Sequence, residues 1–141
     1  MRSYKGLKEE VRGAFHVSSG TVLNGQYPGG VIEWPAGEWK IGVPAGKFGT
    51  FNLVPGNPEI RSAEFFFVAP RVLVGFDICN DGATEATVTV RADGSRVAAY
   101  KVKSGEIQRV RTGWRDATAR VALEFGNGQA LRFDNLAYQH P

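Results

Sequence analysis

The chain has 141 residues, of which 43% are hydrophobic and 22% are charged, and its net charge is +3. This composition fits one globular domain and indicates neither disorder nor a membrane span, because no apolar run approaches the roughly 20 residues of a spanning helix. Eighteen glycines and seven prolines lie between short β-type runs, which predicts a turn-rich all-β fold. The single cysteine, Cys79, excludes an internal disulfide.

The start of the chain carries weak structural signals. Helical periodicity is scarcely present, and we interpret residues 1–13 as a linker or lead-in before a single domain at 14–141. The opening hexapeptide lacks the apolar core of a signal peptide. We therefore expect either an intracellular protein or a module of a longer secreted protein.

The first half of the domain predicts short strands between turns. A strand at 14–17 precedes a glycine-rich turn region, and strands at 31–34 and 39–43 are joined by a link at 35–38 that has the length of a hairpin connection. In 62–68, apolar side chains occupy both faces of the pattern, which predicts a strand in the centre of a sheet.

The second half has the clearer alternation. Strands are predicted at 72–78, 86–91, 98–102, 106–112, 117–125 and 130–138, and the Asp93-Gly94 step indicates a hairpin between two of them. Strands recur at a spacing of roughly 8 to 12 residues, about ten in all, which is typical of a β-sandwich or a barrel.

The final strand contains a break in its alternation. Leu131 and Phe133 share one face, but Leu136 and Tyr138 have switched parity, so the pleat must slip near Asp134. That slip predicts a β-bulge. The Asp134 carboxylate, directed outward there, is a candidate calcium ligand, and pairing with an arginine or a backbone N–H is the alternative.

Several segments resemble the jelly-roll carbohydrate-binding modules attached to secreted bacterial glycoside hydrolases. They are FDICNDG at 76–82, the TGW turn at 112–114, LRFDNLAY at 131–138, and upstream the stretch from 20 to 34 that contains YPGGVIEW. The resemblance implies a two-sheet antiparallel jelly roll without catalytic activity, part of a larger secreted protein with an attached glycoside hydrolase. It also implies a plant cell-wall β-glucan as ligand and a structural calcium, for which it adds Asn24 as a second ligand.

Aromatic side chains are the usual surfaces on which sugar rings stack. Trp114 lies in a predicted turn, where a side chain is less easily packed into the core. Trp34, Trp39 and Tyr27 complete the predicted stacking set, and packing within the protein is the alternative for each of the four. Polar partners for sugar hydroxyls are predicted among five side chains, and each is alternatively solvated surface. They are Glu33, Glu38, Gln108, Arg115 and Asp116.

Three other functions compete with this hypothesis. A nucleic-acid or anionic-glycan binder would use Arg109, Arg111 and Arg115, although most basic residues fall on every second strand position, as a solvated sheet face requires. A structural adhesion module would use every aromatic for packing. A glycosidase needs two carboxylates held across a cleft, and nothing in the sequence favours such a pair. We expect no enzyme, no nucleic-acid partner and no membrane partner.

Overall fold

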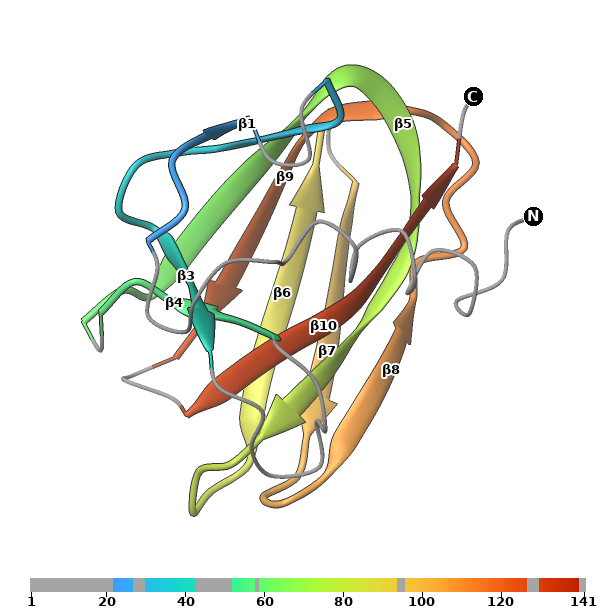
Figure 1. The fold of residues 1–141 in the computed structure, drawn as a ribbon. Coiled ribbons are helices and arrows are strands. Elements are labelled where there is room, and N and C mark those ends of the chain that lie inside the picture. The colour runs from blue at the N-terminus through green and yellow to red at the C-terminus, as the bar shows by residue number, and fades with distance from the viewer. Residues whose placement is uncertain are drawn as a thin grey trace.

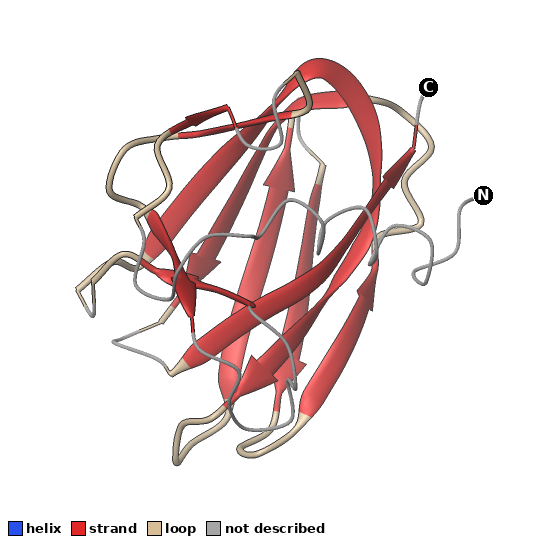
Figure 2. Cartoon of the chain, in the orientation of Figure 1, coloured by secondary structure: helices blue, strands red, loops and turns tan. Residues whose placement is uncertain are grey.

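The computed structural model describes residues 22–26, 30–42, 52–57, 59–93, 96–126 and 130–139. These residues form ten strands and no helix (Figures 1 and 2). In chain order the strands are β1 (Gly25–Gln26), β2 (Ile32–Trp34), β3 (Trp39–Gly42), β4 (Asn52–Pro55), β5 (Ser62–Asn80), β6 (Ala86–Ala92), β7 (Val97–Val102), β8 (Ile107–Arg111), β9 (Thr118–Phe125) and β10 (Leu131–Gln139). The described chain thus offers no helix of the length and apolarity that a bilayer crossing requires.

All strand pairs are antiparallel and they form two layers. Sheet A has the order β3-β4-β10-β5-β8, and sheet B has the order β1-β2-β5-β9-β6-β7. The predicted two-sheet antiparallel sandwich of about ten strands is confirmed. The predicted lead-in at 1–13, the strand at 14–17 and the side chain of Tyr27 lie outside the described residues.

The central strand predicted at 62–68 and the next strand, predicted at 72–78, are halves of one strand, β5. Its first half pairs with β2 and β9, its second half with β10 and β8, and its pairing with β9 shifts register between Phe66 and Arg71. Pro70 lies in this interval and has no N–H to donate to a ladder. Figure 1 shows β5 arching over one end of the molecule from one sheet to the other.

The hairpin predicted between 31–34 and 39–43 is wrong. β2 pairs with β1 and β5 in sheet B, whereas β3 pairs with β4 in sheet A, so the link at 35–38 crosses between the layers. Two strands on opposite sheets that face one core show the same apolar alternation as a hairpin, and the sequence pattern does not separate the two cases. The hairpin at Asp93 is confirmed by the pairing of β6 with β7.

An aromatic cluster fills the space between the sheets at the β2–β3 end. The ring of Trp39 lies 6.1 Å from that of Trp34 and 5.6 Å from that of Phe133, and Trp34 lies 5.4 Å from Phe65. Such tilted and edge-to-face pairs add about 0.5–1.5 kcal/mol each to the burial of the rings. The cluster joins β2 and β5 of sheet B to β3 and β10 of sheet A.

The bulge predicted in the last strand is confirmed. The pairing of β10 with β5 shifts register between Asp134 and Ala137 and again before Tyr138, and Asn135 has a φ of 56°. Asparagine tolerates this left-handed conformation better than most residues. The extra residue turns the strand, so Leu136 and Tyr138 are buried although their parity differs from that of Phe133.

Candidate functional site

Two tryptophans of the predicted stacking set are closed to a sugar in this structure. Trp34 is 2% exposed and Trp39 is 1% exposed, because both rings project between the sheets. The alternative reading of core filling therefore applies to both. A large apolar ring gains more from complete burial than from a place at a strand end, and the crossing of the chain at 35–38 permits both rings to be buried.

Trp114, the first choice for stacking, is half-buried in the loop between β8 and β9. It packs against the core, and the Arg96 guanidinium lies over its ring at 5.4 Å from the centroid. Arg96 is held there by donating to the carbonyl oxygens of Asp116 at 2.7 Å and Ala117 at 3.0 Å. One face of the indole is therefore occupied by the protein's own cation, which removes the open platform that the prediction requires.

The predicted polar partners are not brought together. Arg115 and Asp116 are exposed in the β8–β9 loop, Gln108 is exposed on β8 in sheet A, and Glu33 is exposed on β2 in sheet B. Tyr27 lies outside the described residues. Of the residues singled out from the sequence, Glu38 lines the site described below and Glu33 lies next to it.

Of the two predicted calcium ligands, Asp134 lies on a strand of sheet A and Asn24 lies beside a strand of sheet B. Asp134 lies directly opposite Asp77 across β10 and β5, but the buried Asp77 carboxylate accepts from Arg109 Nε at 3.1 Å and from Asn135 Nδ2 at 2.7 Å. Asn24 is exposed and precedes β1 in sheet B. Within the described residues no group of three His, Cys, Asp or Glu side chains is placed to hold a metal ion. Calcium binding by Asp134 and Asn24 stays a prediction from the sequence.

The outer face of sheet B carries a hollow that sequence analysis did not predict. Ala122 on β9 lies directly opposite Glu64 on β5 and Arg91 on β6. Its short side chain forms the floor of a hollow of about 300 Å³, here called the outer groove. The lining residues are Glu38, Ser62, Ala63, Glu64, Arg91, Arg120, Ala122 and Glu124.

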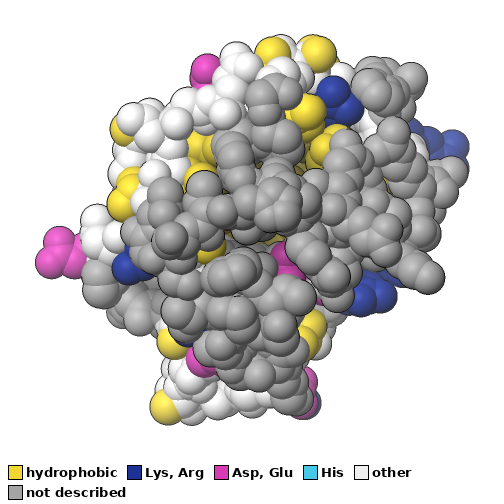
Figure 3. All heavy atoms as spheres, viewed as in Figure 1, with side chains coloured by type: hydrophobic (Ala, Val, Ile, Leu, Met, Phe, Trp, Pro, Cys, Tyr) yellow, Lys and Arg dark blue, Asp and Glu magenta, His cyan; other side chains and the backbone are white. Residues whose placement is uncertain are grey.

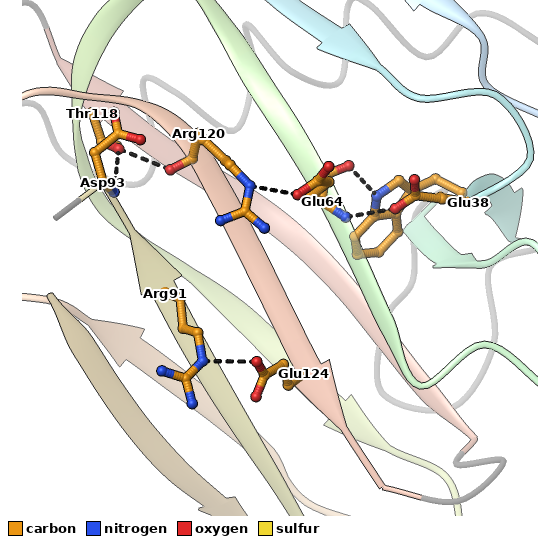
Figure 4. Close-up of polar contacts among 8 residues, drawn as sticks. Glu38, Glu64, Arg91, Asp93, Thr118, Arg120 and Glu124 are labelled. Carbon is orange, nitrogen blue, oxygen red and sulfur yellow. Dashed lines mark hydrogen bonds and ion pairs between the residues drawn. The ribbon is translucent and has the colours of Figure 1, made fainter. Parts of the chain in front are cut away.

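Two ion pairs hold the rim of the outer groove. Arg120 Nε donates to Glu64 Oε2 at 2.5 Å. Arg91 Nε donates to Glu124 Oε1 at 2.7 Å. Each pair is diagonal across neighbouring strands, and about half of each arginine side chain is exposed. Figure 4 shows both guanidinium groups bound through Nε, with their Nη groups extending away from the carboxylates.

Those Nη groups are the hydrogen-bond donors that the site offers. Within the described part of the chain, the guanidinium groups of Arg91 and Arg120 hydrogen-bond to their glutamates through Nε. An arginine fixed in this way presents a planar fork of N–H donors that has already lost much of its side-chain freedom. A ligand that binds the fork therefore meets a smaller entropic cost.

The edge of the groove is built by an interrupted strand pairing. β2 pairs Glu33 with Phe66, and continuing that register would bring Pro35 opposite Glu64. Proline has no N–H to donate, and the chain turns away. In its place, the Glu38 carboxylate accepts from the Glu64 N–H at 2.8 Å, and the Trp39 indole donates to the Glu64 carbonyl at 3.1 Å. These bonds fix Glu64 at the rim.

A half-buried aromatic ring flanks the groove. Phe66 faces outward on β5 and lies directly opposite Glu33 on one side and Arg120 on the other. Across a sheet, side chains of opposed residues lie about 4.5–5.5 Å apart at Cβ. Phe66 therefore brings an apolar surface next to the charged rim.

The far side of the face is held by the β6–β7 hairpin. Asp93 Oδ2 accepts from the Ala119 N–H at 2.7 Å, and the Thr118 hydroxyl accepts from the Asp93 N–H at 3.1 Å. The bond from the Ala119 backbone, with those from Thr118 and Arg120, lowers the pKa of the Asp93 carboxyl below its ordinary value, although burial opposes the shift. This connection fixes β6 against the start of β9, as Figure 4 shows beside Arg120.

The groove residues escaped sequence analysis for a specific reason. Glu64, Arg91, Arg120 and Glu124 each occupy an ordinary outward strand position, which the alternation assigns to solvent. The signal that joins them is the strand order β5-β9-β6, in which residues far apart in the chain become neighbours. No local motif encodes that order.

Comparisons with protein-family models, with curated proteins and with solved structures found no match to this chain. The functional proposal therefore depends on the geometry of the site and on the chemistry of its residues.

Proposed function

We propose that this protein is a non-catalytic carbohydrate-binding module and that its ligand site is the outer groove. The observation that supports this most is the pair of arginine forks, Arg91 and Arg120, fixed by glutamates around the Ala122 floor. A sugar presents pairs of neighbouring hydroxyl groups. A guanidinium fork donates to both oxygens of such a pair, and a carboxylate accepts from both hydroxyl protons.

The groove combines these polar groups with an apolar contact. Phe66, beside Arg120, offers its ring to the C–H face of a pyranose, while Glu33 lies across from it. In this proposal the half-buried Phe66 stacks on the sugar ring, in place of the tryptophans predicted from the sequence. We expect modest affinity from a single ring, and attachment to a catalytic domain would raise it through effective concentration.

The charge of the groove favours an uncharged ligand. Its lining holds three carboxylates and two guanidinium groups. An anionic ligand would meet a net negative surface, which opposes its binding. We therefore propose a neutral polysaccharide, with plant cell-wall β-glucan as the first ligand to test because of the sequence resemblance. An attached glycoside hydrolase and secretion are proposed on the same resemblance.

The alternative function, binding of nucleic acid or an anionic glycan, finds less support. Four arginines on the strands are each paired with a carboxylate, and the face seen in Figure 3 displays both basic and acidic side chains among the described residues. Nucleic-acid binding depends on clustered cations that release counterions. Arg109, one of three arginines predicted for that role, is committed to the buried Asp77.

The test is affinity electrophoresis in gels containing soluble β-glucan, followed by titration calorimetry on oligosaccharides. We expect Arg120→Ala to weaken binding by roughly tenfold or more, since it removes one charge-assisted fork. Arg115→Ala is the matched control, because Arg115 is exposed in the β8–β9 loop and away from the groove lining. A melting curve of each variant verifies folding.

Two outcomes would overturn the proposal. A folded Arg120→Ala variant that binds like the wild type, while Arg115→Ala loses binding, would move the site to the loop. Absence of binding by the wild type to any neutral glycan in a broad array would reject carbohydrate recognition altogether.

A further inference from the structure

A second hollow lies beside the outer groove on the same face of sheet B. It has a volume of about 410 Å³ and shares Glu124 with the outer groove. The second hollow is lined by Glu85, Ala86, Thr87, Thr89, Glu124, Phe125 and Gly126.

The strand register places the two hollows in line. Thr89 on β6 lies directly opposite Glu124 on β9. Arg91, two residues later on β6, lies opposite Ala122. Continuing this register past the end of β9 at Phe125 would bring Thr87 opposite Gly126, a position without a side chain. Strands lie about 4.8 Å apart and advance about 3.3 Å per residue, so Thr87 is on the order of 16 Å from Glu64 across the face.

The chemistry of the second hollow continues that of the first. Thr87 and Thr89 project outward on β6, with Thr87 exposed and Thr89 half-buried, and their hydroxyl groups both donate and accept. Glu85 adds an acceptor at the far end. Together the two hollows are lined by four glutamates and two arginines. The lining is therefore net negative over its whole length and disfavours an anionic ligand.

We propose that the second hollow is a further sugar subsite and that the two hollows bind one linear, uncharged oligosaccharide across sheet B. This inference rests on the proposed function and deepens it: the ligand is a chain several sugar units long, and a single ring does not fill the site. Glu124 is the junction, since it borders both hollows while Arg91 holds its carboxylate.

The experiment is calorimetry of the full chain with a series of β-glucan oligosaccharides from two to six units. We expect affinity to rise with length until both hollows are filled. Thr87→Val and Thr89→Val remove one hydroxyl each and keep the β-branched shape, which spares the strand. We expect each to weaken binding of the longest oligosaccharide by roughly three- to tenfold and to leave the disaccharide unchanged.

Controls separate this inference from the proposed function. Thr84→Val changes an exposed turn residue that lines neither hollow and is expected to have no effect. Wild-type affinity that is independent of length, together with sensitivity to Arg120→Ala, would overturn the second subsite and leave the outer groove. Unchanged binding of the longest oligosaccharide by both threonine variants would also overturn it, and failure of every oligosaccharide to bind would overturn both proposals.

Discussion

The two faces of sheet B show what large side chains do in this molecule. Along the first half of β5, Phe65 and Phe67 face inward and are buried, while Glu64 and Phe66 face outward. The inner face joins the aromatic cluster of Trp34 and Trp39, and the outer face carries charged groups around a hollow. Two of the aromatic residues that suggested a binding surface, Trp34 and Trp39, therefore build the core, and residues that suggested plain solvated surface form a groove with paired arginine forks.

The inner and outer faces of sheet B also differ in how much their side chains contribute to the free energy of unfolding. Burying an aromatic ring between the sheets contributes several kcal/mol to stability, whereas an exposed ion pair contributes about 0–1 kcal/mol. Changes on the inner face should therefore unfold the protein, and changes on the outer face should alter binding alone. The predictions below test that separation.

The largest effect is expected at Trp39. Its replacement by alanine removes two ring contacts and the hydrogen bond to the Glu64 carbonyl, and we expect a loss of about 3–5 kcal/mol in the free energy of unfolding, measured by urea denaturation. Trp39→Phe keeps an aromatic ring and serves as the milder variant, with a smaller loss expected. Equal stability of Trp39→Phe and the wild type would show that the indole N–H is not needed at the groove edge.

An intermediate effect is expected from a matched pair of arginine variants. The Asp77 side chain is 4% exposed, and Arg109→Ala removes its arginine partner while the hydrogen bond from Asn135 Nδ2 stays, so we expect a loss of about 1–2 kcal/mol. Arg91→Ala breaks a pair in which both side chains are nearly half exposed, and we expect at most about 0.5 kcal/mol. The measurement is urea denaturation of both, and a reversed order would break the distinction between buried and exposed pairs.

The smallest effect is expected from the protonation of Asp93. Its pKa is lowered in the folded state by the Ala119 N–H, so its contribution to stability is present above the ordinary aspartate pKa of about 3.9 and is lost as the pH falls through the folded value. We expect the stability difference between the wild type and Asp93→Asn to be constant near neutral pH and to shrink below about pH 4. Thermal melting from pH 7 to pH 2.5 measures it, and a difference that grows in acid would contradict the assignment.

Part of the fold was predictable because its signals are local. The alternation in the strands and the Asp93 hairpin depend on neighbouring residues, and the bulge in β10 was visible as a change of parity between Phe133 and Leu136. The side of the chain that each residue faces follows from the period of two along a strand. These features appear in the structure where the pattern placed them.

The errors have a common origin in contacts between distant segments. The pattern at 31–43 fits a hairpin and a crossing between sheets equally well, and the crossing is what buries Trp34 and Trp39. Trp114 sits in a turn, as predicted, but Arg96 from the β6–β7 side covers its ring. In the same way, the partner of Arg120 is Glu64, far away in the chain.

The amino-acid sequence by itself determined the all-β class, the strand faces and the bulge near Asp134, since these depend on the stereochemistry and polarity of consecutive residues. Tertiary structure alone decided which sheet each strand joins, which tryptophans are buried and where a groove opens over Ala122. The physical reason is that strand pairing can satisfy the same backbone hydrogen bonds with many partners, and only the packing of the whole core selects among them.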